Sequence, residues 1–158
     1  MNVNMAEAAV KEIEHVPAPT RRFELADLSQ HGAWLMKRFT AEFPDMTDNA
    51  IAGYLRGILF SNEHLFLYQD NAVGLAQLVY SPGIRPVKVV QERFVWIKDR
   101  NNKEWCENAA DFYAEMQQWG KRQGAERLIA CEDTDVPKAL IEARIGRLFD
   151  TKISHARI

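Results

Sequence analysis

The sequence predicts an α/β fold in which a mixed β-sheet carries helices on both faces. In Val95-Trp96-Ile97 the apolar residues are consecutive, as in a strand that is covered on both sides. A polar loop follows, and then an amphipathic helix that closes at Gly124. The apolar side of that helix repeats at helical spacing and comprises Ala109, Phe112, Tyr113, Met116 and Trp119.

The other elements follow from hydrophobic periodicity and from turn residues. The expected order is β-α-α-β-β-β-α-β-α-β, a mixed sheet with helices on both faces. The expected ranges are a strand at 21–26, helices at 28–43 and 48–59, strands at 63–69 and 72–80 joined by an Asp70-Asn71 turn, a strand at 89–98, the central helix, a strand at 126–131, a helix that ends at Gly146 and a strand at 148–158.

Polar residues in front of each helix are expected to cap it, because their side chains can accept hydrogen bonds from the first-turn N–H groups. The expected caps are Asp27 or Ser29 for the first helix, Thr47 or Asp48 for the second, a capping box of Asn101 and Glu104 for the central helix, and the acidic loop at 132–135 for the last.

The composition indicates one soluble globular core. The chain has 158 residues, of which 47% are hydrophobic and 27% charged, and its net charge of −2 implies no general attraction to nucleic acid or to acidic membranes. Cys106 and Cys131 have no metal-ligand spacing, so we expect reduced thiols, no metal site and a cytosol-like compartment. No apolar run approaches the roughly 18 residues of a membrane span, and no signal peptide is recognisable. The basic pairs are expected to be solvated: Arg21-Arg22, Lys37-Arg38 and Lys121-Arg122.

The first 20 residues are expected to form an arm outside the domain at 21–158. A short helix is possible there before the prolines at 17 and 19 extend the chain. A protein partner that docks the arm, in a homo- or hetero-oligomer, is one expectation, and an arm folded back on its own domain is the other. The apolar side of the arm comprises Ala9, Ile13 and Val16.

The order of elements over Arg22–Ile158 resembles the GNAT superfamily of N-acetyltransferases. The local matches are Val73-Gly74-Leu75-Ala76 in the hairpin, the run from Trp119 to Ala125 after the central helix, and Gly146 after the last helix. In active members, acetyl-CoA lies between the fourth and fifth strands. The resemblance implies that its pantetheine would pair with the main chain of Val95, Trp96 and Ile97.

The same resemblance places the pyrophosphate on a loop of pattern (Arg/Gln)-x-x-Gly-x-(Gly/Ala) at the start of the central helix. This chain has Asn102, Trp105 and Glu107 at the three defining positions, where an indole and a carboxylate obstruct the approach of main chain to phosphate. Glu104 and Glu107 also lie near the positive end of the helix dipole, which disfavours a further anion there. Lys103 and Arg100 would offset this in part. We therefore expect no cofactor, or acetyl-CoA held by Asn102 and Lys103 if the chain is active.

The catalytic positions implied by the resemblance are incomplete. Glu92 in the fourth strand could deprotonate an amine, although an ordinary polar strand residue is the simpler interpretation. The position of the general-acid Tyr, four residues before Gly146, holds Glu142, so Tyr80 or Tyr113 would have to substitute if the fold brings one near.

The favoured hypothesis is a non-catalytic GNAT-like module for binding or assembly, whose partner contacts the arm and Trp105. Small GNAT-like proteins from the structural gene blocks of tailed bacteriophages are similar in size and in their leading arm, which implies a cytoplasmic or virion location. The alternative is an acetyl-CoA-dependent N-acetyltransferase with an atypical pyrophosphate loop. A third hypothesis, an inhibitor of a host protein, has only the acidic patch at 132–135 in its favour.

Overall fold

The computed structural model describes residues 19–81, 84–131, 133–147 and 155–157. Its centre is a sheet whose strands lie side by side in the order of the sequence, and all neighbours are antiparallel except β4 and β5, which are parallel. The strands are β1 Arg21–Arg22, β2 His64–Gln69, β3 Ala72–Ser81, β4 Val87–Ile97, β5 Arg127–Ile129 and β6 His155–Arg157.

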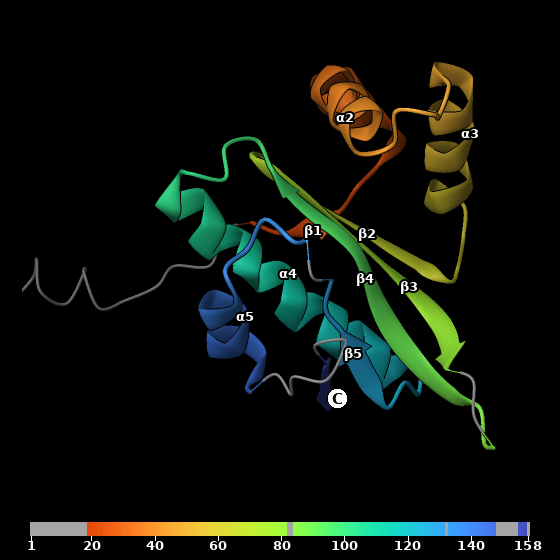
Figure 1. The fold of residues 1–158 in the computed structure, drawn as a ribbon, viewed down its shortest axis with the longest axis vertical. Coiled ribbons are helices and arrows are strands. Elements are labelled where there is room, and N and C mark those ends of the chain that lie inside the picture. Colours follow the sequence, from red (N-terminus) through yellow and green to blue (C-terminus); the bar gives the residue numbers. More distant parts are fainter. Residues whose placement is uncertain (1–18, 82–83, 132, 148–154, 158) are drawn as a thin grey trace, which may run out of the picture.

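The helices cover the sheet on both faces, as Figure 1 shows, with α2 and α3 on one side and α4 and α5 on the other. The predicted fold class and the predicted order of elements are confirmed, with one added 3-10 turn. The helical elements are η1 Leu25–Asp27, α2 Leu28–Glu42, α3 Asp48–Leu59, α4 Lys103–Arg122 and α5 Lys138–Ile145.

Two separate apolar clusters hold these layers together. The cluster under α2 and α3 includes Leu35, Phe39 and Trp96, and the one under α4 and α5 includes Val95 and Tyr113. Val95, Trp96 and Ile97 are all buried, as their uninterrupted apolar run predicts. Full burial of a Val, Leu, Ile, Phe or Met side chain contributes roughly 1.5–3 kcal/mol relative to exposure, so both clusters stabilise the layered sheet.

Gly74 in β3 explains one of the motifs that carried the family resemblance. A Cβ built on it would lie 3.0 Å from Cδ2 of Phe112 and 3.4 Å from Cε of Met116 in α4. Because a Cβ there would press against the Phe112 ring, glycine favours the close packing of α4 on the sheet.

The first strand and the first cap differ from the prediction. The strand expected at 21–26 is only two residues long, because the chain turns into η1 at Leu25. The carboxylate of Asp27 does not cap α2 with its side chain; it accepts hydrogen bonds from the Arg21 guanidinium at 2.7 Å and from the Glu24 main-chain N–H. Arg21 is therefore ion-paired, not simply solvated.

The caps of the later helices follow the prediction in part. Thr47 accepts from the N–H of Ala50 and caps α3 as expected. The capping box of Asn101 and Glu104 is wrong by one residue, because α4 begins at Lys103 and Asn102 is the residue whose side chain accepts from the first turn. Gly146 ends α5 with φ of 88°, a conformation that favours glycine.

Some predictions lie outside the described residues, namely the arm with Ala9, Ile13 and Val16 and most of the strand at 148–158. Within the described part, none of the helices has both the length and the apolar character of a membrane span.

Candidate functional site

The candidate site is the place where β4 and β5 separate. The two strands pair in parallel from Val89 opposite Arg127 to Gln91 opposite Ile129, and no further pairs follow between described residues. Beyond Gln91 the edge of β4 has lost its neighbour, so its main-chain N–H and C=O groups need other partners. At such a fork, another segment of the chain or a ligand can pair with the exposed main chain.

A β-bulge directs Glu92 into this fork. Leu75 and Ala76 of β3 lie opposite Phe94 and Glu92, so Arg93 is an extra residue in β4. The extra residue reverses which face alternate side chains point to. Glu92 thereby shares the α4 face with Val95, although without the bulge it would share the opposite face with Phe94.

Glu92 joins the two strands just past their last main-chain pair. Its side chain is fully enclosed, with the residue 2% exposed, and its Oε1 accepts a hydrogen bond of 3.0 Å from the N–H of Cys131. Oε2 makes no hydrogen bond of good geometry, although the Tyr113 and Thr134 hydroxyls lie close by and bond each other at 2.6 Å. The carboxyl group thus bridges β4 to the segment after β5.

Burial raises the pKa of the Glu92 carboxyl to about 7, because desolvation disfavours its charged form. The charge of Asp135 raises it further, while the Cys131 N–H and the hydroxyls of Tyr113 and Thr134 act in the opposite direction. Near neutral pH the group is therefore divided between its charged and neutral forms.

Asp135 occupies the open edge of β4 beyond Glu92. Its main-chain N–H donates to the carbonyl oxygen of Val95 at 3.3 Å, and its Oδ2 accepts from the N–H of Ile97 at 3.0 Å. The next residue, Val136, is buried in the cluster under α4 and α5. The loop after β5 thus pairs with β4 where a fifth strand would otherwise continue.

Arg38 of α2 anchors this loop from the other side of the sheet. Its two terminal nitrogens donate to the two carboxylate oxygens of Asp135 at 2.9 and 2.8 Å, a bidentate ion pair. The Asp135 side chain is 2% exposed and that of Arg38 21%. The hydrogen bond to Asp135 raises the pKa of Arg38, and its guanidinium also lies 5.1 Å from the centre of the Trp96 ring.

Two sequence predictions are wrong at this point. The Lys37-Arg38 pair was expected to be solvated, but only Lys37 is exposed, since Arg38 turns inward to Asp135. The acidic loop was expected to cap the last helix, yet α5 begins after Pro137 with no side-chain cap, because the Asp135 carboxylate is engaged by Ile97 and Arg38.

The start of α4 places the loop residues as follows. Asn102 caps the helix through its side chain, Lys103 is exposed, and Trp105 is half-buried against the α4 core cluster. Oε2 of Glu107 pairs with Arg144 of α5 at 3.1 Å, so its charge is partly balanced within the chain. The residues predicted to obstruct a pyrophosphate are thus engaged in holding this helix in place.

The tyrosine candidates separate clearly. Tyr80 is 67% exposed at the far end of β3, whereas Tyr113 is buried beside Glu92 in the fork. Glu142, at the position of the expected general acid, is partly buried and lies within 4 Å of Lys138. Among the described residues, no group of three His, Cys, Asp or Glu side chains has the arrangement of a metal site.

The edge of β4 in the fork is already bonded within the chain. The family resemblance assigned the pantetheine arm of coenzyme A to the main chain of Val95, Trp96 and Ile97. The carbonyl of Val95 and the N–H of Ile97 are both already bonded to Asp135. An occupant of that edge would have to displace a buried ion pair as well as two hydrogen bonds.

Sequence reasoning named Glu92 as a possible base on the fourth strand, with an ordinary polar strand residue as the simpler interpretation, and it missed Arg38, Thr134 and Asp135. Arg38 and Asp135 are separated by 97 residues, and neither has a local pattern that points to the other. The only signal was the acidic loop itself, and its position before a helix favoured a different role.

Comparisons with solved structures identify the fold. The glucosamine-6-phosphate N-acetyltransferase from Arabidopsis thaliana has a TM-score of 0.64 at 14% identity, covering 84% of this chain and 92% of that one. An acetyltransferase from Vibrio fischeri has a TM-score of 0.52 at 14% identity, covering 75% of this chain and 98% of that one. No protein-family model matches the sequence, and no curated protein matches it. The chain therefore has the GNAT-like topology that the sequence predicted, while such low identity carries no activity with it.

Proposed function

We propose that this chain is a non-catalytic GNAT-fold module that binds other proteins, and that its cofactor cleft is closed by its own residues. The observation that carries the proposal is the pairing of Asp135 with Val95 and Ile97 along the open edge of β4. Those are the groups that a cofactor of this fold would need.

The electrostatics of the closed fork support the proposal. Opening it would separate the carboxylate of Asp135 from Arg38 and so break a bidentate, largely buried ion pair. Glu92 adds a second closure, because its carboxyl bonds the N–H of Cys131. A ligand would have to compensate for both losses before it gained any net affinity.

The pyrophosphate position supports the same conclusion. Asn102 already satisfies an N–H of the first turn of α4, and Trp105 and Glu107 stand where the family has glycine or another small residue. Fewer unpaired donors and more bulk leave a weaker anion site at this helix N-terminus.

Titration calorimetry with acetyl-CoA tests the absence of cofactor binding. We expect no heat of binding for the wild-type chain up to millimolar ligand. The matched variant Asp135→Ala removes the acceptor for Ile97, so binding by this variant alone would identify Asp135 as the block. A micromolar dissociation constant for the wild-type chain would overturn the proposal. A ligand present at 100 times its dissociation constant would also stabilise the fold by about 2.7 kcal/mol, a shift of several degrees.

The partner is a protein surface in this proposal, with the arm at residues 1–20 as its expected contact. The virion assignment rests only on the resemblance to small GNAT-like phage proteins in size and leading arm. Light scattering on the full chain and on a chain lacking residues 1–20 provides the test. An assembly that is unchanged by the deletion would count against the arm as the contact.

One observation favours an N-acetyltransferase as a second candidate. Glu92 has a pKa of about 7, which suits a general base at neutral pH, and the Tyr113 hydroxyl lies beside it. This function requires the loop around Asp135 to leave β4. Acetyl transfer to an amine that is lost in Glu92→Gln would establish it in place of the module.

A further inference from the structure

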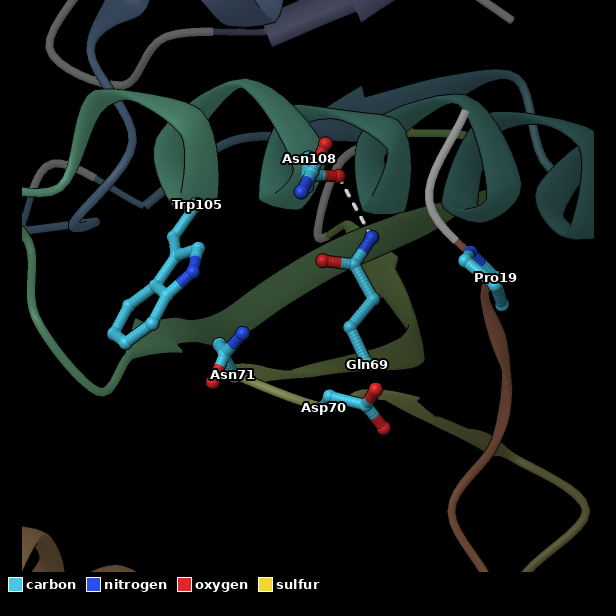
Figure 2. A pocket seen from close by; sticks show the side chains of 6 residues that line it. All are labelled: Pro19, Gln69, Asp70, Asn71, Trp105 and Asn108. Atoms are coloured by element: carbon cyan, nitrogen blue, oxygen red, sulfur yellow. Dashed lines mark hydrogen bonds between the residues drawn. The ribbon is translucent and has the colours of Figure 1, made fainter. Parts of the chain in front are cut away.

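A pocket lies between the first turns of α4 and the β2–β3 hairpin. Its volume is about 150 Å³, which is enough for one small functional group, such as the end of a side chain, but not for a peptide segment. Figure 2 shows the side chains that line it, which are Pro19, Gln69, Asp70, Asn71, Trp105 and Asn108.

Gln69 is the buried polar group at the base of this pocket. The residue is 4% exposed, and its Nε2 donates to the main-chain oxygen of Asn108 at 2.7 Å and to Oγ1 of Thr20 at 3.0 Å. A carbonyl oxygen can only accept, so these bonds fix which end of the amide is nitrogen. The oxygen Oε1 is thereby turned into the pocket, and among the described residues nothing donates to it.

Trp105 supplies the complementary group. In Figure 2 the nitrogen edge of its indole faces the same space as the Gln69 oxygen, and no hydrogen bond to a described residue uses that N–H. The amides of Asn71 and Asn108 border the same space. The Asp70 carboxylate lies on the Pro19 side, and its Oδ1 already accepts from Tyr68.

We propose that this pocket binds a primary carboxamide, such as the side chain of Asn or Gln from a partner protein, with its oxygen on Trp105 Nε1–H and its nitrogen on Gln69 Oε1. Trp105 Nε1–H and Gln69 Oε1 offer one donor and one acceptor whose orientations are fixed by the ring and by the hydrogen bonds of Gln69, and a carboxamide carries one of each on adjacent groups. A carboxylate has no proton for Gln69 at neutral pH, and a guanidinium has no acceptor for Trp105.

Gln69 Oε1 faces the open space of the pocket, so the N–H of a bound amide would replace water as its donor. This inference rests on the proposed protein-binding function, which it refines at Trp105. It is tested with a different ligand from coenzyme A, so either can fail while the other stands.

The test is an NMR titration of the full ¹⁵N-labelled chain with propionamide, which follows the Trp105 indole N–H and the Gln69 side-chain amide. Propionate, guanidinium and N-methylacetamide are titrated in parallel. We expect propionamide to shift both signals in a saturable way. The indole N–H of Trp34 is an internal control, because it already donates to His31 on the opposite face of the sheet.

Two variants complete the experiment. Trp105→Phe keeps an aromatic ring and removes the donor, so we expect the shift at Gln69 to need about three- to tenfold more propionamide, the effect of one hydrogen bond. Asn71→Ala, at the pocket rim, is expected to change this affinity less. Absence of any shift, an unchanged affinity in Trp105→Phe, or tighter binding of propionate or guanidinium would overturn the carboxamide assignment. Tighter binding of N-methylacetamide would overturn it in favour of a main-chain peptide group.

Discussion

Replacing Glu92 with Gln is expected to make the protein more stable at alkaline pH. The wild-type carboxyl is enclosed where β4 and β5 separate, and burial raises its pKa from 4.5 to about 7. Glutamine keeps an oxygen for the N–H of Cys131 and can donate to the hydroxyls beside it. It removes the cost of burying a charge.

The magnitude follows from linkage. A raised carboxyl pKa means that the folded state holds the proton more tightly than the unfolded state, so the stability contributed by Glu92 is complete below pH 4.5 and is lost as pH rises toward 7. The shift of about 2.5 units corresponds to roughly 3 kcal/mol in all, at about 1.4 kcal/mol per unit. About 2.5 kcal/mol of this falls between pH 5 and pH 8 by the same linkage relation.

Urea unfolding at pH 5 and pH 8 measures the effect. We expect the free energy of unfolding of Glu92→Gln, relative to wild type, to be about 2.5 kcal/mol more favourable at pH 8 than at pH 5. Glu63→Gln is the matched control, because Glu63 is exposed and lies directly before β2. If the difference in the free energy of unfolding between wild type and Glu92→Gln stays constant within about 0.5 kcal/mol from pH 5 to pH 8, the assignment of Glu92 as a buried carboxyl with a raised pKa is refuted.

Two further predictions concern the closure of the fork and the packing of the sheet. Arg38→Ala leaves the Asp135 carboxylate buried and without its ion-pair partner. We therefore expect the free energy of unfolding to fall by about 2–4 kcal/mol and amide hydrogen exchange in the loop after β5 to become faster. Lys37→Ala, at the exposed neighbouring residue, is the control and is expected to change neither quantity. Gly74→Ala places a Cβ 3.0 Å from an aromatic carbon of α4, so thermal unfolding should show a loss of about 1–3 kcal/mol in the free energy of unfolding. Gly57→Ala in α3 places its Cβ in open space and should raise the free energy of unfolding by up to about 1 kcal/mol. The same amide hydrogen exchange rate in Arg38→Ala and Lys37→Ala would contradict the first prediction. The same free energy of unfolding in Gly74→Ala and Gly57→Ala would contradict the second.

The layered architecture was predictable because its determinants are local. The helical spacing of the apolar residues of α4 and the uninterrupted run in β4 each depend on neighbours within one or two turns. Gly146 and Thr47 act within the helix that each one limits. The ends of the elements were less predictable. β1 ends after Arg22, and the η1 turn that follows brings Asp27 to the Arg21 guanidinium, with which it forms an ion pair.

The closure of the fork was not predictable, because its partners meet only in three dimensions. Asp135 reads as a capping residue in sequence, and Arg38 reads as the exposed half of a basic pair. What unites them is the vacant edge of β4, which exists only because β5 is three residues long and diverges. The β-bulge at Arg93 was equally unpredictable, since the pattern of apolar and polar residues in β4 does not indicate an inserted residue.

The pKa of Glu92 cannot by itself distinguish a general base from a buried structural acid. In both cases desolvation is the principal cause, and a value near 7 would serve catalysis as well as it reflects enclosure. What separates the two is access, since a base must come within hydrogen-bond reach of an amine. In this fold one oxygen of Glu92 is bonded to Cys131, and the route past it along β4 is closed by Asp135 and its ion pair with Arg38. Asp135, whose charge also raises the pKa, thus lies between Glu92 and the open edge of β4, which supports the proposal of a non-catalytic module.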